Sequence, residues 1–426
     1  MNVLVFPCGS EIGLEIHAAL AWQKDITLFG VSSVADHGEF TYRNYRKINE
    51  HVHAVDFIDQ LNKLVDEWGI DIIMPAHDSV FLRLSEAQAA QQLLAHAAVP
   101  ALEQARICRN KNSTYAFFAD CDFVPRSLSL ADASYPIFAK PAVSQGSLGA
   151  EIVHNAGRHQ ELLDATTEYV FSEYLPGLEL TVDCLSDGNG LLRNVAPRER
   201  CRVKSGISVR TRPFNADASI IRISEQIAQR LKLKGAWFFQ LRQDTHGQWK
   251  LLEIAPRIAG SMGLSRHLGI NYPLLSLYAY LQLPFSLLLQ SYPIVMDRAL
   301  RSRYRVTLEY DQVYLDLDDT LLHRGRVNPV LLVLLYQWAA SGVQVHLITR
   351  HESCPYKTLA KHKIARELFS SVIHIVDGCL KSSHIPKGER ALFIDDSFRE
   401  RLDVSETLRV PVFDLDSIDQ LIDWRE

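Results

Sequence analysis

Apolar and polar positions along the first hundred residues alternate in blocks that predict strands and helices in turn. Apolar runs typical of strands cover 2–9, 26–32 and 70–76, and segments with helical spacing cover 11–22 and 57–69. Because strand–helix–strand units cross over in a right-handed sense, this order predicts a parallel sheet with helices on both faces. The first 98 residues are therefore expected to form a doubly wound α/β domain.

The pattern then changes to shorter runs with alternating side chains and reversing turns. Two strands flank a small-residue loop within 135–154, and further antiparallel strands flank a turn at 187–190. A helix at 223–233 precedes a hairpin at 236–257. Residues 99–296 are accordingly expected to form an α+β domain.

One stretch, Leu268–Met296, has no charged side chain and is long enough to span a bilayer. It is interrupted by three prolines and two glutamines: Pro273, Pro284, Pro293, Gln282 and Gln290. Because proline ends helices, we expect buried helices of a soluble domain here and not a membrane span. The arginine-rich segment that follows, 297–310, is expected to be a linker.

The last part of the chain, 311–426, again predicts an α/β domain. One apolar run ends in Asp316 and Asp318, and another ends in Asp395 and Asp396. Because parallel strands bring their carboxyl ends to one sheet edge, we expect these acids to gather there. A carboxylate can attack phosphorus, a second one can exchange a proton with the leaving oxygen, and crowded acids usually need a divalent cation.

Composition limits the class of protein. A chain of 426 residues is expected to hold two to four domains. Its 45 basic and 50 acidic residues argue against a general nucleic-acid binder. The seven cysteines lack CxxC or zinc spacing, which favours a reducing, cytoplasmic compartment. No basic leader precedes the first apolar run, so no signal peptide is expected.

Two turns in the first domain lie where a strand leads into a helix, a natural place for an anionic ligand. One contains Ser10, between Gly9 and Gly13, and the other contains His77 and Asp78. An ordinary tight turn is the commoner explanation for each of them. Ser10 and Asp78 are kept as candidate substrate residues.

The middle of the chain supplies, in order, the groups needed to hold ATP and pass on its terminal phosphoryl group. Two lysines provide cations, a small-residue loop can fold backbone donors over phosphates, and two acids have the spacing for base and ribose. An amide and a carboxylate on the two hairpin arms can face one metal ion, and an arginine follows. These residues are Lys111, Lys140, the loop Ser144–Gly149, Glu173, Glu179, Gln240, Glu253 and Arg257. Taken singly, each residue is a weak signal of an ATP site, because such lysines and glutamates are usually solvated. The ordered set is a far more specific signal.

On these motifs, residues 2–289 resemble the ATP-grasp superfamily, and most nearly the branch with the carbamoyl phosphate synthase large subunit and biotin carboxylase. The resemblance implies a preATP-grasp domain and two α+β lobes that clamp ATP. It implies a reaction in which a carboxylate becomes an acyl phosphate that an amine or another nucleophile attacks, with Arg257 beside the phosphates. It implies that Mg²⁺ or Mn²⁺ is coordinated by Gln240 and Glu253. The residues that it implies contact ATP are Lys111, Lys140, Ser144, Gly146, Ser147, Gly149, Glu173, Leu175 and Glu179.

The chain departs from this family at one position. It has Ala255 where the family usually has a metal-binding asparagine. Because a methyl group cannot coordinate Mg²⁺, one ion is expected to be held less firmly or with extra water. A site that only senses nucleotide is therefore an alternative to a working ligase.

A basic run at 197–214 lies close to where such a fold would hold its carboxylate substrate. Guanidinium groups suit carboxylates, although a solvated edge strand explains most of these cations better. The six cations are Arg198, Arg200, Arg202, Lys204, Arg210 and Arg212. Arg202 is the preferred candidate substrate residue.

The final domain resembles the haloacid dehalogenase-like (HAD) phosphatase superfamily through its acid pairs and the motifs between them. The resemblance implies that Asp316 is the nucleophile and Asp318 its acid/base partner. It also implies that Thr349 hydrogen-bonds the phosphoryl group and that Lys381, or alternatively Lys387, neutralises charge. The implied ligands of Mg²⁺ or Mn²⁺ are a main-chain carbonyl and Asp316, Asp318, Asp395 and Asp396. About thirty residues separate successive motifs, which leaves no room for a cap and predicts a capless Rossmann-like domain with an open site.

The sequence thus predicts a bifunctional enzyme, an ATP-dependent ligase joined to a Mg²⁺-dependent phosphatase. Its expected partners are a small-molecule carboxylate, an amine and a phosphorylated small molecule, with no nucleic acid and no membrane span; a homodimer is compatible with the sequence. One alternative makes the last domain a docking or regulatory module that lacks turnover.

Overall fold

The computed structural model describes residues 1–144, 146 and 148–425. The chain divides into two compact units, Met1–Leu300 and Arg301–Glu426. The predicted position of Ser147 in the small-residue loop lies outside the described residues.

The first unit begins with a parallel sheet in the order β3-β2-β1-β4-β5. Both faces are buried because side chains along β1 alternate: Val3 and Val5 pack with α1 and α9, and Leu4 and Phe6 pack with α2 and α3. The strands are β1 (Asn2–Phe6), β2 (Thr27–Ser32), β3 (Asn44–Lys47), β4 (Ile72–Pro75) and β5 (His96–Ala97). The helices are α1 (Glu11–Leu20), the 3₁₀ helix η1 (His37–Phe40), α2 (Phe57–Trp68), α3 (Asp78–Ala89) and α9 (Tyr272–Tyr280).

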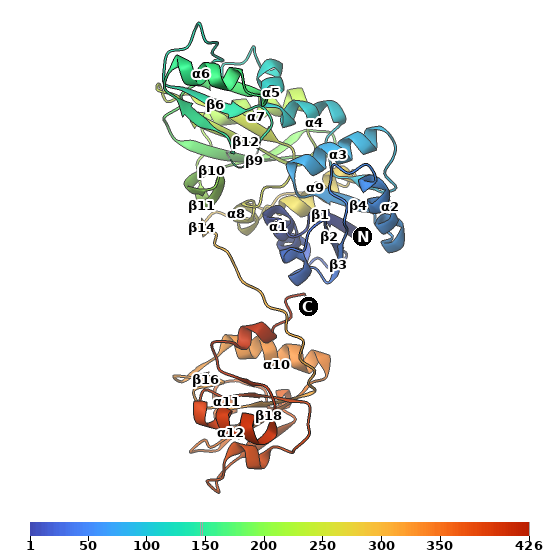
Figure 1. Ribbon diagram of the computed structural model, residues 1–426, viewed down its shortest axis with the longest axis vertical. Helices are drawn as coiled ribbons and strands as arrows, with labels where there is room; N and C mark the ends of the chain where they lie inside the picture. The colour runs from blue at the N-terminus through green and yellow to red at the C-terminus, as the bar shows by residue number, and fades with distance from the viewer. Residues whose placement is uncertain (145, 147, 426) are drawn as a thin grey trace. The chain divides into compact units, whose positions relative to one another are not determined.

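Two antiparallel sheets complete this unit, one of six strands in the order β13-β12-β9-β10-β11-β14 and one of three in the order β7-β6-β8. In Figure 1 the six-stranded sheet lies between the parallel sheet and the three-stranded sheet. The six strands are β9 (Glu179–Ser186), β10 (Leu192–Lys204), β11 (Ile207–Pro213), β12 (Gly235–Gln243), β13 (Trp249–Ala255) and β14 (Met296–Asp297). The three are β6 (Ile137–Pro141), β7 (Glu151–Val153) and β8 (Tyr169–Glu173). Their helices are α4 (Leu102–Arg109), α5 (Lys111–Phe117), α6 (Ala156–Leu163), α7 (Ala218–Leu231) and α8 (Gly263–His267).

The prediction of buried helices over the charge-free stretch is wrong for its second half. Only α9 forms there, and the chain from residue 281 to 295 has no helix or strand. Pro284 and Pro293 prevent a helix in this segment, which leaves Leu288 74% exposed. Among the described residues, no helix is long and apolar enough to cross a membrane.

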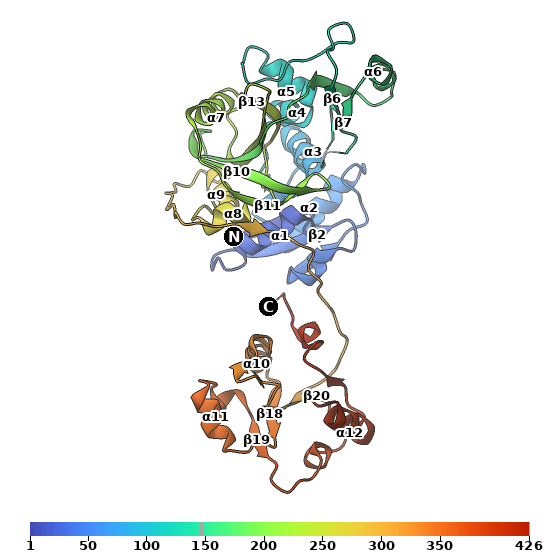
Figure 2. The same ribbon diagram turned by 90° about the vertical axis from the view of Figure 1, so that its left-hand side faces the viewer.

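The second unit is built on a parallel sheet in the order β19-β18-β15-β20-β21. One face packs with α10 and α11 and the other with α12, as the turned view in Figure 2 shows. The strands are β15 (Gln312–Leu315), β16 (Leu322–His323), β17 (Arg326–Val327), β18 (Gln344–Thr349), β19 (Ser371–His374), β20 (Ala391–Ile394) and β21 (Val412–Phe413). The helices are α10 (Pro329–Ser341), α11 (Pro355–Lys361), α12 (Phe398–Leu408) and the 3₁₀ helices η2 (Arg366–Leu368), η3 (Lys381–His384) and η4 (Ile418–Leu421). In the described part of this unit, the chain between β15 and α10 forms only the small hairpin β16–β17.

Candidate functional site

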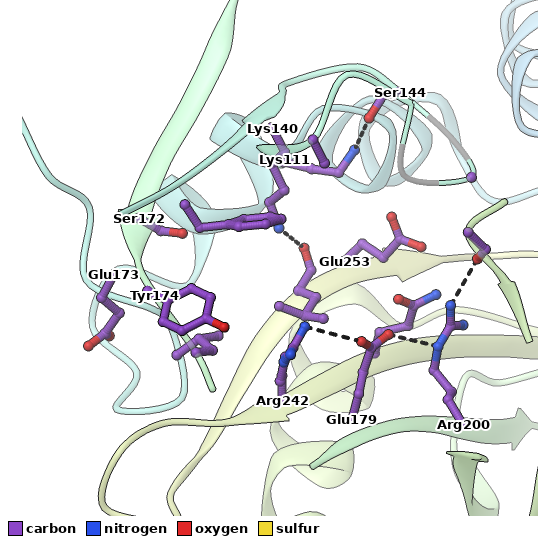
Figure 3. Close-up of a pocket in the computed structure, with 17 residues that line it drawn as sticks. Lys111, Lys140, Ser144, Ser172, Glu173, Tyr174, Glu179, Arg200, Arg242 and Glu253 are labelled. Atoms are coloured by element: carbon purple, nitrogen blue, oxygen red, sulfur yellow. Dashed lines mark hydrogen bonds and ion pairs between the residues drawn. The ribbon is translucent and has the colours of Figure 1, made fainter. Parts of the chain in front are cut away.

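A pocket of about 820 Å³ opens in the first unit between the three-stranded and six-stranded sheets (Figure 3). Its floor follows from strand alternation, because Phe239 and Leu241 of β12 pack toward α7 while Gln240 and Arg242 face the pocket. The residues that line it are Lys111, Phe138, Lys140, Ser144, Gly146, Ala150, Ser172, Glu173, Tyr174, Leu175, Glu179, Arg200, Gly206, Gln240, Arg242, Leu252 and Glu253. The volume of about 820 Å³ includes space that is open to solvent.

Two buried lysines form the cationic side of this pocket. Lys140, on β6, donates to the Tyr115 hydroxyl at 2.8 Å and to the Leu252 carbonyl at 2.8 Å. Burial lowers the pKa of Lys140 to about 7. Lys111 donates to the Ser144 hydroxyl at 3.2 Å, and burial lowers its pKa as well. Among the described residues, neither ammonium group has a carboxylate as its hydrogen-bond partner, so both are suited to an incoming anion.

Gln240 and Glu253 are cross-strand neighbours on β12 and β13, and both line the pocket. An amide oxygen and a carboxylate fit Mg²⁺, which prefers oxygen ligands. The negative charge of Glu253 acts on Lys140, which places the carboxylate within electrostatic reach of the lysine pair. Ala255, two residues further along β13, is buried and offers no ligand atom.

Glu179 lies between two arginines that the sequence did not single out as site residues. Arg200 Nε lies 2.7 Å from one carboxylate oxygen and Arg242 Nη1 lies 3.5 Å from the other. Arg200 also donates to the Gly206 carbonyl, as Figure 3 shows. The period-two alternation of β12 could have identified Arg242, since it shares a strand face with Gln240.

The structure does not bring Arg202 to the pocket. Its side chain is 58% exposed and pairs with Asp297 at 2.9 Å. The reason is a register shift in the β10–β11 pairing between Arg200 and Arg202, which interrupts simple alternation along the strand. Arg200, buried and in contact with Glu179, is the cation of this basic run that lines the pocket.

The opposite end of the pocket is less polar. Tyr174 lies there, and the Glu173 carboxylate points away from the lysines in Figure 3; Phe138 and Leu175 also line the pocket. Glu173 accepts a hydrogen bond from the backbone of Arg126 at 2.8 Å, so its carboxylate supports the loop beneath this end. The rings and Leu175 suit a flat base.

The small-residue loop is described in part. Gly146 and Gly149 have positive φ angles of 59° and 73°, which disfavour other residues at both positions. Gly146 lines the pocket, whereas Gly149 packs close to Pro141 outside the set of lining residues. Ser144 reaches Lys111, as described above.

Arg257, Asp78 and Ser10 lie outside the residues that line this pocket. Arg257 donates to both carboxylate oxygens of Asp78 at 2.7 Å, and its guanidinium lies 5.2 Å from the centre of the Phe238 ring. Ser10 caps α1 through Gly13 N and donates to backbone carbonyls. Asp78 and Ser10 therefore have structural partners, and their proposed contact with substrate gains no support from this geometry.

A second site lies at the carboxyl edge of the sheet in the second unit. The buried Lys381 donates to Asp316 at 2.5 Å and to Asp395 at 2.6 Å. Burial raises the pKa of Asp316 above its ordinary value, against the opposing effect of Lys381. Lys387, the alternative lysine, is exposed. Of the two candidates, Lys381 is the one that the fold brings to the acids.

The acids fit a divalent cation. One oxygen each from Asp316, Asp395 and Asp396 lie within 4.8 Å of one another. Thr320 donates to Asp396 at 3.1 Å and orients it. The Asp318 carboxylate is not a member of this cluster: it is half exposed and lies 2.9 Å from Nδ1 of His351. Three carboxylates around one point match the hard oxygen ligands that Mg²⁺ prefers.

Thr349 ends β18 and is fully buried. Its hydroxyl oxygen accepts a hydrogen bond from the backbone of His351 at 3.1 Å. The sequence did not identify His351, although its place two residues after Thr349, at the same sheet edge as the acids, was a usable signal.

Sequence comparison matches residues 165–295 to a family model described as ATP-grasp in the biosynthetic pathway with Ter operon. Comparison with curated proteins found no match. Among solved structures, pyruvate carboxylase from Rhizobium etli is 17% identical with a TM-score of 0.53, covering 65% of this chain. The chain spans only 28% of that protein.

Two further structures are covered over most of their length. N5-carboxyaminoimidazole synthetase from Staphylococcus aureus, complexed with ADP, is 14% identical with a TM-score of 0.56, covering 70% of this chain and 82% of that one. L-amino acid ligase from Bacillus licheniformis is 19% identical with a TM-score of 0.52, and the match covers 66% of this chain and 74% of the ligase. At these identities the likeness is one of fold. With the family match and the pocket between two sheets, it identifies an ATP-grasp fold in this chain.

Proposed function

We propose that the chain is an ATP-dependent ligase that activates a carboxylate as an acyl phosphate and joins it to an amine or a related nucleophile. The observation that carries the proposal is the pocket in which Lys111 and Lys140 face Gln240 and Glu253. Cations for phosphates and oxygen ligands for Mg²⁺ occur there together, as phosphoryl transfer requires. We assign the preATP-grasp domain to 1–98 and the ATP-grasp lobes to 99–296, closest in type to the carbamoyl phosphate synthase and biotin carboxylase branch.

In this proposal each side chain has a defined task. Lys111 and Lys140 bind the phosphates, and phosphate binding converts Lys140 to its charged form. Phe138, Tyr174 and Leu175 hold the base, while Glu179 accepts from the ribose. Mg²⁺, held by Gln240 and Glu253, would neutralise charge on the phosphates. We include Arg200, which pairs with Glu179 and donates to the Gly206 carbonyl, among the residues that contact the nucleotide.

The proposed substrates are small molecules. An L-amino acid ligase shares the fold, and amino acids therefore belong in a first screen of carboxylates and amines. ATP and Mg²⁺ as reactants suit a cytoplasmic enzyme. The test is ADP formation over crossed carboxylates and amines with Mg²⁺ or Mn²⁺, comparing the whole chain with Lys140→Ala. ADP formation that Lys140→Ala does not reduce contradicts the proposed site.

For the second unit we propose a capless, HAD-like, Mg²⁺-dependent phosphomonoesterase. Asp316 would attack phosphorus while Asp318 gives a proton to the leaving oxygen, and Lys381 neutralises charge. Mg²⁺ at Asp316, Asp395 and Asp396 would let a carboxylate approach a phosphate dianion. The carrying observation is the buried triad of Lys381 with Asp316 and Asp395. Loss of phosphate release in Asp316→Asn is the test.

Ala255 favours a second candidate for the first unit, a nucleotide sensor. A site that binds Mg²⁺ weakly could hold ATP without turning it over. ATP binding in the absence of ADP formation with every acid and amine tested would favour the sensor over the ligase.

A further inference from the structure

His351 is the closest polar partner of the proposed acid/base residue in the second unit. Its ring Nδ1 lies 2.9 Å from each carboxylate oxygen of Asp318. The histidine side chain is 17% exposed and the aspartate side chain 50% exposed. Asp318 is thus held from the protein side, while its other side is open to solvent and to a substrate.

The contact of the ring with Asp318, together with two hydroxyls at Nε2, sets the tautomer of a neutral imidazole. Nε2 lies 2.7 Å from the Thr358 hydroxyl and 2.9 Å from the Ser353 hydroxyl. Two hydroxyls can donate to Nε2, whereas an ionised Asp318 can only accept. The neutral ring therefore carries its proton on Nδ1 and donates it to Asp318.

The backbone of His351 is held as firmly as its ring. Its amide donates to Thr349 Oγ1 at 3.1 Å, and its carbonyl accepts from His374 Nε2 at 2.7 Å. Thr358 belongs to α11 and His374 ends β19, so separate elements fix one side chain. Such support is typical of a residue that orients a functional group.

We propose that His351 is a positioning residue for general acid/base catalysis by Asp318. The proposal rests on the phosphatase function proposed for this unit. A half-exposed aspartate would otherwise sample several rotamers, and the Nδ1–H bond restricts it to orientations that leave an oxygen toward the leaving group.

The proton balance shows where the orientation matters. Asp316 attacks phosphorus, the bond to the leaving oxygen breaks, and protonated Asp318 gives its proton to that oxygen. Water then attacks the aspartyl phosphate, Asp318 takes a proton from this water, and phosphate leaves Asp316. Asp318 regains the proton that it gave, while His351 keeps its own throughout.

The test uses leaving groups of different quality. In the full chain with Mg²⁺, kcat/KM is measured for p-nitrophenyl phosphate, whose good leaving group needs little protonation, and for phenyl phosphate. General acid catalysis is worth about 10²–10⁴-fold. His351→Gln should lower kcat/KM for phenyl phosphate at least about tenfold more than for p-nitrophenyl phosphate, and Asp318→Asn should show the same selectivity more strongly.

A matched variant separates positioning from simple support of the loop. An asparagine amide lies about where Nδ1–H lies and can donate to Asp318, whereas a glutamine amide lies nearer Nε2. His351→Asn should therefore recover most of the activity on phenyl phosphate that His351→Gln loses. Equal losses on both esters in all His351 variants would mean that the residue is only structural.

A second readout does not depend on turnover. In protein labelled with ¹⁵N-histidine, Nδ1 of His351 should show the shift of a protonated nitrogen and Nε2 that of an acceptor. The opposite tautomer overturns the proposal. If the wild-type chain hydrolyses neither ester with Mg²⁺, the result contradicts the proposed phosphatase function and, with it, the proposed role of His351. Activity that Asp318→Asn leaves intact removes only the acid/base assignment and the role of His351.

Discussion

Lys140 of the first unit and Lys381 of the second are both buried, yet their surroundings move their pKa values in opposite directions. Burial lowers the pKa of Lys140 to about 7, and its hydrogen-bond partners are a hydroxyl and a carbonyl. At Lys381 burial acts in the same sense, but Asp316 and Asp395 outweigh it and raise the pKa. The first lysine lacks an anion that a nucleotide can bring, and the second already has two.

The difference teaches what each site requires from its ligand. A pocket whose two lysines have no carboxylate as a described hydrogen-bond partner gains most from phosphates. A cluster with three carboxylates near one ammonium group still has an excess of negative charge and gains most from a divalent cation. The same residue type thus favours the proposed nucleotide site in one unit and the proposed metal-assisted site in the other.

The largest expected effect is on the chemistry of the second unit. Asp316→Asn removes the proposed nucleophile and should reduce Mg²⁺-dependent phosphate release by at least about 10³-fold. Asp319→Asn is the matched control, because Asp319 is exposed on the same loop and its φ of 53° suits asparagine. Phosphate release is measured on both variants. Equal activity of Asp316→Asn and the control rules out Asp316 as nucleophile.

The next effect is on stability and differs in size between the two units. Lys381→Met leaves Asp316 and Asp395 buried without their cation and should lower the free energy of unfolding by about 3–5 kcal/mol at pH values above the raised pKa values of these carboxylates. Lys140 has a pKa lowered to about 7 and has no ion pair to lose, so Lys140→Met should change the free energy of unfolding by no more than about 1–2 kcal/mol, through the loss of two hydrogen bonds. Denaturant unfolding, followed for each unit, measures the change in the free energy of unfolding for both variants. Destabilisation of similar size by both variants contradicts the contrast.

The pH dependence of the Lys381→Met penalty follows from the carboxylates. Their pKa values are raised in the folded protein and rise further without Lys381, so protonation relieves the repulsion. The penalty should be full above these raised values and shrink as pH falls toward the ordinary carboxylate range. If the loss of stability in Lys381→Met grows as the pH falls, the result contradicts this prediction.

Nucleotide binding should also depend on pH. Since the pKa of Lys140 is lowered to about 7, the lysine is largely neutral above that pH and must take up a proton when phosphates bind. ATP affinity should fall by up to about tenfold per pH unit above 7. Calorimetry in two buffers of different ionisation enthalpy measures the uptake. Proton release, or an affinity that rises with pH, contradicts this prediction.

The smallest effect concerns Ala255. Ala255→Asn restores an oxygen ligand beside Gln240 and Glu253 and should lower the Mg²⁺ concentration needed for ATP binding by about threefold. Ala255→Leu, similar in size but without a ligand atom, controls for crowding against Phe238. Equal effects of both substitutions would mean that the position does not contact the metal.

Strand periodicity and ordered motifs were enough to predict the doubly wound domain and the lysines, the glutamates and Gln240 of the pocket, but not Arg200 and Arg242. The position of Arg202 was not predictable, because a local register shift in β10 changes which side chains face inward. The irregular chain at the end of the charge-free stretch, without helix or strand, depends on Pro284 and Pro293, whose effect on the prediction of helices was not taken far enough. His351 was missed because it matches no motif; it follows β18 and meets Asp318, which follows the neighbouring strand β15.

The most direct test of the nucleotide site is calorimetric titration of ATP with Mg²⁺ into the wild-type chain, Lys140→Met and Lys250→Met. Lys250 lies on β13 outside the pocket and donates to the Asp122 carbonyl. We predict that Lys140→Met weakens ATP binding by about 10–100-fold, the value of a charged hydrogen-bonding group, while Lys250→Met leaves it unchanged. Wild-type affinity in Lys140→Met would contradict the assignment of this pocket to ATP.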